Sequence, residues 1–343
     1  MTGGRPSSVR LVQIADGSVR RVALVDEPDL RPLVSVSSVH ALAARAASAG
    51  ESLARLAVWD ATGERIPYDP VYDGASHWRL LPPVDHPDEP ARCLVSGTGL
   101  THVGSARDRD AMHDPDDAAM SDSMRMFRAG LEGGRPVPGA IGAAPEWFYK
   151  GTGAVLRAHG EPLLVPSYAE DGGEEAEVAG IYVIDAAGRP RRIGMAAGNE
   201  FSDHAYERRN YLHLAASKLR TCALGPEIVL DPAFDSVAGD VWIERGGARH
   251  WAKRILTGED VMCHSLGNIE HHHFKFEGHR RPGDVHVHFF GAPSLSFGDG
   301  IALEDGDITA VAFEGFGRAL RNVVRIDRAA DRLVPVLPLA GGV

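Results

Sequence analysis

Hydrophobic and polar positions alternate near the start of the chain, and residues 9–35 are typical of short strands. Within them, residues 9–25 (VRLVQIADGSVRRVALV) form two alternating runs on either side of Asp16-Gly17. An Asp-Gly pair between two such runs predicts a β-hairpin, because glycine tolerates the backbone angles of a tight turn. Residues 37–57 begin with serine and are rich in alanine and leucine, which predicts a helix.

Short apolar runs separated by glycine and proline turns dominate the chain from residue 145 onward. The amphipathic stretch DHAYERRNYLHLAAS (residues 203–217) predicts a helix, whereas runs such as AEVAGIYVID and DVHVHFF have the length of strands. Many short strands with few helices are typical of a mostly-β core. We therefore predict an α+β fold that is mostly β.

The length of 343 residues favours about two domains. Residues 77–90 (HWRLLPPVDHPDEP) are proline-rich and predict a linker. We expect a small N-terminal α/β domain at residues 1–88 and a larger domain at residues 89–343. Residues 104–135 are polar and partly helical, and their composition predicts either a flap over a site or a plain surface excursion.

Composition limits the classes of partner. The formal net charge of −11 argues against a nucleic-acid surface, because phosphate contacts need clustered lysine and arginine. A local basic pocket for a small anion is still compatible with that charge. The three cysteines are scattered, the first residues lack an apolar signal-peptide core, and no apolar run is long enough to span a bilayer. We expect a cytoplasmic protein without a membrane partner.

Carboxylates supply the first candidate chemistry. Glu175 and Glu177 are two positions apart before an apolar strand, so both side chains lie on one face. Two such carboxylates repel each other unless a cation lies between them, although a solvated acidic turn would give the same pattern. Glu200 after Gly198-Asn199, at the expected head of a helix, and Lys218 before a Gly-Pro turn complete a set of three oxygen ligands and one ammonium. That set suits Mg²⁺, which keeps positions open for substrate oxygens.

These motifs, followed by PGDVHVHFFGAP and LEDGDITAVAFEGFGRALRNVV, closely resemble the fumarylacetoacetate hydrolase superfamily over roughly residues 90–327. The resemblance implies a mixed β-sandwich or roll, a homodimer, and Mg²⁺ held by Glu175, Glu177 and Glu200. The third ligand is usually aspartate in that family, and the longer glutamate leaves Mn²⁺ or Ca²⁺ open as alternatives.

The branch of the family is indicated by residues near the start of the large domain. Hydrolase members carry Asn-Tyr-x-x-His, with the histidine as base for an attacking water; here His102 lies close, but Asn-Tyr is missing. Thr101, Ser105 and Arg107, followed by PEWFYKGTG, resemble instead the sugar-acid dehydratase branch. That resemblance implies catalytic roles for Glu146 in the Pro-Glu-x-Phe-x-Lys segment and for Ser105, although Ser105 could equally be a turn hydroxyl. We expect Thr101 and His102 to contact the substrate.

The chemistry of such a dehydratase is physically consistent with these residues. A 2-keto acid can chelate Mg²⁺, which stabilises the enolate formed when the C3 proton leaves. A carboxylic acid must then protonate the departing C4 hydroxyl, and Glu146, in an apolar setting, is the candidate. Lys218 would hold the keto oxygen or the substrate carboxylate and balance the anionic ligands. The expected substrate is a 2-keto-3-deoxy sugar acid and the expected product a semialdehyde such as 2,5-dioxopentanoate. The alternatives are a hydrolase that cleaves an acylpyruvate-like C–C bond and a non-catalytic binding protein.

Residues 268–290 hold a dense group of histidines. His271, His272 and His273 follow one another in a predicted helix, so they point about 100° apart and cannot all bind one ion. His286 and His288 alternate on a strand and share one face. We favour His271 or His288 as a substrate contact or support, with Ser294 as a further substrate contact after the Gly291 turn. A zinc site of His286, His288 and a helical histidine is the sharper alternative.

Overall fold

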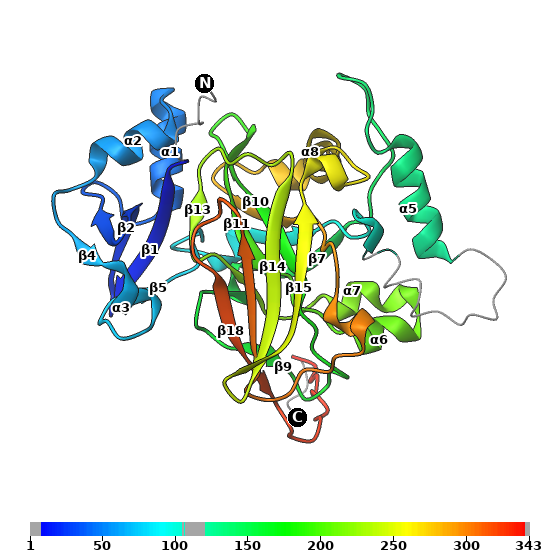
Figure 1. Cartoon of the computed structure of the whole chain (residues 1–343). Coiled ribbons are helices and arrows are strands. Elements are labelled where there is room, and N and C mark those ends of the chain that lie inside the picture. The colour runs from blue at the N-terminus through cyan, green and yellow to red at the C-terminus, as the bar shows by residue number, and fades with distance from the viewer. Residues whose placement is uncertain (1–7, 105, 107–120, 340–343) are drawn as a thin grey trace.

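The computed structural model describes residues 8–104, 106 and 121–339, and its core consists of two β-sheets (Figure 1). The larger sheet has 13 strands, β1 (Arg10–Asp16), β2 (Val19–Asp26), β3 (Asp29–Pro32), β4 (Ile66–Pro67), β5 (Arg79–Leu80), β6 (Cys93–Gly97), β7 (Phe148–Thr152), β8 (Leu156–Arg157), β10 (Ala176–Ile184), β11 (Pro190–Asn199), β12 (Cys222–Leu224), β13 (Ile228–Val229) and β16 (Val285–Phe289). The second sheet has five strands, β9 (Leu163–Val165), β14 (Val237–Arg245), β15 (Ala248–Thr257), β17 (Ile308–Phe313) and β18 (Leu320–Ile326).

Helices are short and lie around the sheets. The α-helices are α1 (Val39–Ala49), α2 (Leu53–Asp60), α3 (Tyr68–Tyr72), α5 (Asp122–Gly133), α6 (His204–Arg209), α7 (Leu214–Ser217) and α8 (Leu266–Phe274). The 3₁₀ segments are η1 (Pro90–Arg92), η2 (Gly153–Val155), η3 (Tyr211–His213), η4 (Glu259–Val261), η5 (Glu277–Arg280) and η6 (Ser296–Asp299). Among the helices of the described ranges, none has the length and apolar character needed to cross a bilayer.

The N-terminal region confirms the predicted hairpin and corrects the predicted helix. Strands β1 and β2 pair antiparallel around the Asp16-Gly17 turn, with Asp16 opposite Val19. The single helix expected over residues 37–57 is two helices, because Gly50 adopts the left-handed conformation (φ 66°) that ends α1. Ser38 and Ser52 each cap one helix by accepting a hydrogen bond from a backbone N–H.

The proline-rich segment at residues 77–90 packs against the sheet, although its composition predicts a linker. Strand β5 within it pairs with β1, and the Gln13 side chain donates to the Pro82 carbonyl at 2.7 Å. Strand β1 also pairs with β13, so the N-terminal strands extend the large sheet. The division into domains at residue 88 stays a prediction.

The centre of the large sheet is buried on both faces. Every residue of β10 is buried, and β10 pairs with β11 on one side and β16 on the other. One face of these strands packs against α1 and the N-terminal strands, and the other packs against α8 and the five-stranded sheet. A strand buried on both faces is largely apolar, so any polar side chain within it needs a partner.

The segment after β11 also differs from its prediction. The single helix expected over residues 203–217 is broken into α6, η3 and α7. Asp203 caps α6 by accepting from the Tyr206 N–H, and Asn210 interrupts the helix in an extended conformation while its side chain caps η3.

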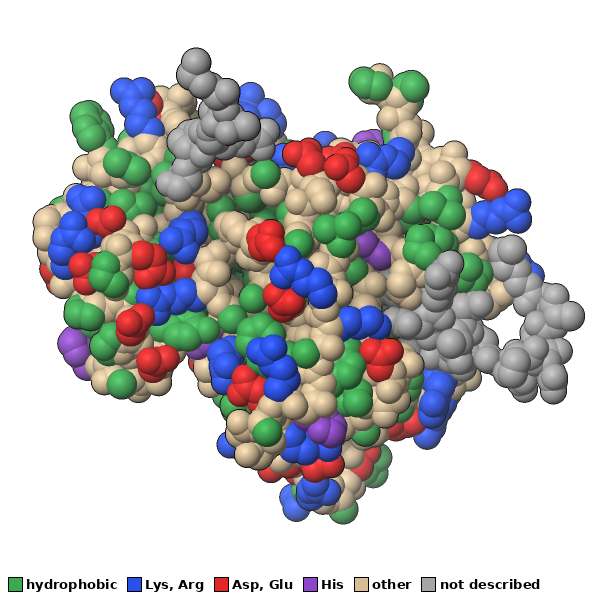
Figure 2. Space-filling model, in the orientation of Figure 1, with side chains coloured by type: hydrophobic (Ala, Val, Ile, Leu, Met, Phe, Trp, Pro, Cys, Tyr) green, Lys and Arg blue, Asp and Glu red, His purple; other side chains and the backbone are tan. Residues whose placement is uncertain are grey.

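On the face of the molecule seen in Figure 2, acidic and basic side chains are interspersed, so this face presents no continuous basic surface.

Candidate metal centre and active site

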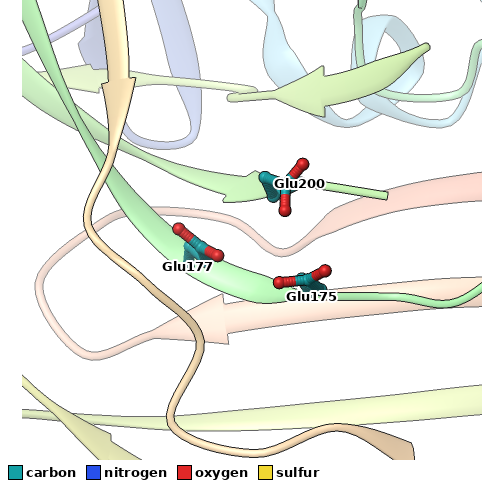
Figure 3. A group of neighbouring side chains, drawn as sticks. All are labelled: Glu175, Glu177 and Glu200. Atoms are coloured by element: carbon teal, nitrogen blue, oxygen red, sulfur yellow. The ribbon is translucent and has the colours of Figure 1, made fainter. Parts of the chain in front are cut away.

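Three buried carboxylates meet where β10 and β11 come together (Figure 3). Glu175 precedes β10, Glu177 lies on it opposite Gly198 of β11, and Glu200 directly follows β11. One oxygen of each carboxylate lies within 4.8 Å of the others, and each residue is at most 4% exposed. The predicted convergence of these three side chains is confirmed.

Asn199 fixes the backbone on which two of the carboxylates stand. Its side-chain oxygen accepts hydrogen bonds from the backbone N–H groups of Glu175 (3.1 Å) and Phe201 (3.2 Å), and the Glu200 N–H donates to the Glu175 carbonyl at 2.9 Å. Gly198 and Asn199 belong to β11, not to the turn that the sequence predicts. The two strands therefore hold the carboxylates through one continuous ladder.

Two buried lysines bind the carboxylates from different elements. Lys218, after α7, donates to Glu175, to Glu200 at 2.6 Å, and to the Ser202 hydroxyl at 3.0 Å. Lys150, on β7, donates to the Glu200 carboxylate and, at 2.8 Å each, to the Glu200 and Phe201 carbonyls. The sequence predicts Lys218 near the ligands. Lys150 belongs to the Pro-Glu-x-Phe-x-Lys segment, but the sequence indicates no role for it. Together the two lysines hold the Glu200 carboxylate in place.

The buried carboxylates of this site outnumber its buried lysines. Burial raises the pKa of Glu177 well above its usual range, and the charges of Glu200 and Glu175 add to this effect. Burial, and then the charge of Glu175, also raises the pKa of Glu200, although both lysines oppose the shift. Three carboxylates against two ammonium groups leave a net charge of about −1 when these five groups are ionised and the neighbouring His204 is neutral. An all-oxygen donor set with excess negative charge fits a hard divalent cation such as Mg²⁺.

His204, which the sequence did not single out, completes the contacts of Glu175. It begins α6, is 1% exposed, and its Nε2 lies 3.0 Å from Glu175 Oε1. Burial lowers the pKa of His204, but the hydrogen bond and charge of Glu175, together with the charge of Asp171, outweigh burial, so the net pKa is raised. Gly173 makes room for the ring, because a Cβ there would lie 2.1 Å from His204 Nδ1.

Glu146, two residues before β7, lies on the same side of the chain as Phe148 and Lys150. Successive side chains of an extended segment alternate between faces, and burial follows that rule here: Glu146, Phe148 and Lys150 are buried, whereas Trp147 is 37% exposed. The Lys218 ammonium lies 4.8 Å from the centre of the Phe148 ring. The Tyr211 hydroxyl, on η3, donates to Glu146 Oε2 at 3.1 Å. Reading PEWFYK with period two would have found Lys150, but nothing local in the sequence indicates Tyr211.

Comparisons with known proteins reveal the fold. No family model matches the chain, and no curated protein sequence is similar to it. Solved structures do match: 2-keto-3-deoxyarabinonate dehydratase in a hexagonal crystal form has a TM-score of 0.70 at 20% identity, covering 93% of this chain and 100% of that one. The structure of 2-keto-3-deoxy-D-arabinonate dehydratase complexed with magnesium and 2,5-dioxopentanoate gives a TM-score of 0.69 at the same identity and coverage. Fumarylacetoacetate hydrolase from psychrophilic Exiguobacterium antarcticum gives 0.58 at 18% identity, again over 93% and 100%.

The chain has the fumarylacetoacetate hydrolase fold. The predicted α+β, mostly-β class and the resemblance stated from the motifs are confirmed at the level of this fold. The carboxylates predicted from the family pattern lie where the start of β10 meets the end of β11.

Three of the predicted substrate contacts lie within the fumarylacetoacetate hydrolase fold as buried side chains. The Thr101 hydroxyl donates to the Phe290 carbonyl at 2.7 Å, and His102 has one ring nitrogen 2.8 Å from Thr101 and the other 3.1 Å from the Thr257 hydroxyl. Burial lowers the pKa of His102 to about 3, so the ring is neutral. Ser294 is 6% exposed. Ser105, and Arg107 with it, lies outside the described residues, and the substrate roles stay predictions.

The histidines of residues 268–290 lie away from the carboxylates. In the register of β10 and β16, Ala179 pairs with Phe289 and Gly180 with His288, so His288 and Glu177 point to opposite faces of the sheet. The ring nitrogens of His288 lie 2.9 Å from the Ser96 hydroxyl and 2.7 Å from the Thr98 hydroxyl. His271 is exposed on α8.

The zinc alternative finds no support in this arrangement. Across residues 8–104, 106 and 121–339, Glu175, Glu177 and Glu200 are the one group of three metal-ligand side chains close enough to share an ion. Both nitrogens of His288 are already engaged by hydroxyl groups. His288 and His271 as substrate contacts stay untested predictions.

Proposed function

We propose that this protein is a Mg²⁺-dependent hydro-lyase that dehydrates a 2-keto-3-deoxy sugar acid to a 2-keto semialdehyde such as 2,5-dioxopentanoate. The observation that carries the proposal is the buried, oxygen-only carboxylate set, together with a fourth buried carboxyl, Glu146, on the same side of its segment as Lys150. The similar structure that holds magnesium and 2,5-dioxopentanoate supports this choice of substrate class.

The divalent cation would be held by Glu175, Glu177 and Glu200, with Mn²⁺ or Ca²⁺ as alternatives to Mg²⁺. When bound, it supplies Lewis acidity toward the keto and carboxylate oxygens of a 2-keto acid. The protein itself positions the three anionic side chains for binding the cation. Lys218 and Lys150 do this by neutralising two of the charges, and His204 by orienting Glu175.

Glu146 would move the proton. Its carboxylate takes the C3 proton of the substrate and returns it to the C4 hydroxyl, which departs as water. This step leaves a double bond between C3 and C4, conjugated with the keto group. Transfer of a proton from C5 to C3 then gives the enol at C4–C5, which tautomerises to the aldehyde, so the sum is loss of one water. Tyr211 holds one oxygen of Glu146 through its hydroxyl, which fixes the orientation of the carboxyl plane.

The runner-up, hydrolysis of an acylpyruvate, would need His102 as a base for water. In the structure both ring nitrogens of His102 lie within hydrogen-bonding distance of threonine hydroxyls, and burial holds its pKa near 3. A neutral, fully engaged imidazole of such low basicity is a poor base at neutral pH. This arrangement favours the lyase over the hydrolase.

One assay separates the alternatives. Purified protein with Mg²⁺ is incubated with 2-keto-3-deoxypentonates of both configurations and, separately, with an acylpyruvate, and the products are identified by NMR. Formation of 2,5-dioxopentanoate, abolished by EDTA and restored by Mg²⁺, is the expected result. Release of pyruvate from the acylpyruvate would instead establish the hydrolase, and no turnover of either substrate would support a non-catalytic binding protein. We also propose a cytoplasmic homodimer, which light scattering after gel filtration and subcellular fractionation test.

A further inference from the structure

The histidine group on α8 and β16 contains a hydrogen-bonded chain that begins next to Glu146. The Trp147 indole N–H donates to His273 Nδ1 at 3.1 Å, and His273 Nε2 lies 3.0 Å from His286 Nδ1. The Trp147 ring stacks on His273 (ring centres 6.4 Å apart, 29° between planes) and also lies against His279 at 5.7 Å. The segment that leads into β7 is thus anchored on the face opposite to Glu146.

The donor properties of tryptophan set the direction of this chain. An indole N–H can donate but not accept, so His273 Nδ1 must be unprotonated. Burial, followed by the neighbouring histidines, lowers the pKa of His273, and burial lowers that of His286 to about 3. Both rings are therefore neutral, His273 carries its proton on Nε2, and it donates to His286 Nδ1.

The alternation along the strand links this chain to the proposed acid. Trp147 and Glu146 are adjacent and point to opposite faces, so a ring held on one side sets the direction of the carboxyl group on the other. We propose that Trp147, His273 and His286 position Glu146. The expected effect on kcat rests on the proposed function, whereas the expected effect on the orientation of Glu146 does not.

Side-chain replacements test the link between Trp147 and His273. Trp147→Phe keeps an aromatic ring but removes the N–H, and His273→Leu removes the acceptor. His273→Asn keeps an acceptor oxygen near the position of Nδ1. Trp242→Phe is the matched control, because its indole N–H also donates to a side chain, Glu244 at 2.7 Å, on β14 of the other sheet.

We expect Trp147→Phe and His273→Leu to lower kcat by about 10- to 100-fold, which is what a misplaced catalytic group costs. KM and the Mg²⁺ affinity should stay unchanged. His273→Asn should keep kcat within about threefold of wild type, and the double variant Trp147→Phe/His273→Leu should be no worse than either single one. A kcat within twofold of wild type for Trp147→Phe, with only a lower unfolding temperature, would reduce the chain to a structural role.

A measurement without turnover keeps this inference separate from the proposed function. In a crystal structure of Trp147→Phe, the contact between Tyr211 and Glu146 should be lost, whereas Trp242→Phe should retain it. Nitrogen-15 NMR of labelled histidine should report the Nε2–H tautomer for His273. A retained contact in Trp147→Phe, or an Nδ1–H tautomer for His273, would overturn the inference whether or not the enzyme dehydrates a sugar acid.

Discussion

Replacing His288 by glutamine should make the protein less sensitive to acid. Burial lowers the pKa of His288 to about 3, whereas an unfolded histidine titrates near 6.5. Between these values the unfolded chain binds a proton that the folded chain does not. The stability that His288 contributes is therefore fully present above about pH 6.5 and is lost as the pH falls toward 3.

The size of this effect follows from the two pKa values. Between pH 7 and pH 5, one such histidine lowers the free energy of unfolding by about 2 kcal/mol. Glutamine does not titrate, and its amide can still bond the Ser96 and Thr98 hydroxyls that now contact His288. The difference in unfolding free energy between wild type and His288→Gln should thus shift by about 2 kcal/mol in favour of the variant on acidification.

Urea unfolding followed by circular dichroism at pH 7 and pH 5 measures this difference. All other groups titrate in both proteins, so their contributions cancel in the comparison. His271→Gln, at an exposed position of α8, is the control and should follow the wild type at both pH values. Equal pH dependence of wild type and His288→Gln would refute the conclusion that His288 is buried as a neutral ring.

Three further substitutions test the site. Glu177→Gln relieves carboxylate repulsion and keeps an acceptor for the Gly291 N–H, so the metal-free variant should be no less stable than wild type. Calorimetry should show that the variant loses the stabilisation of about 2.7 kcal/mol that Mg²⁺ gives at 100 times Kd. An undiminished stabilisation by Mg²⁺ would exclude Glu177 as a ligand. Glu146→Gln should keep that response while kcat falls by roughly 10²- to 10⁴-fold in the product assay; full activity would remove Glu146 from the mechanism. Lys150→Met leaves the buried Glu200 with one lysine fewer and should destabilise the metal-free protein by about 3 kcal/mol in urea unfolding, whereas a loss below about 1 kcal/mol would mean that this ion pair contributes little.

Local patterns in the sequence predict part of the site because they act over a few residues. The two-residue spacing of Glu175 and Glu177 places both on one face of a strand whatever surrounds it, and the Asp16-Gly17 turn forms where its residues predict it. The sequence also contains a signal for the interruption at Gly50, because glycine ends helices readily. The alanine-rich pattern on both sides nevertheless favoured one helix. The breaks within residues 203–217 follow from capping by Asp203 and Asn210, which compete with an unbroken helical pattern.

Contacts between distant segments could not be predicted in this way. His204 and Glu175 are 29 positions apart, Lys150 and Glu200 are 50 apart, and Tyr211 and Glu146 are 65 apart. Each pair depends on how β7, β10, β11 and the segment after β11 are placed side by side. No periodicity within one segment carries that information.

His286 and His288 show most clearly which features the sequence determines and which depend on the tertiary structure. The sequence by itself determined that His286 and His288 share a face, because side chains in a strand alternate with period two. Only the tertiary structure decided which face: the pairing of Gly180 with His288 turns both rings toward α8 and away from Glu177. Alternation is a property of one strand, but the register between two strands is set by the packing of the whole sheet.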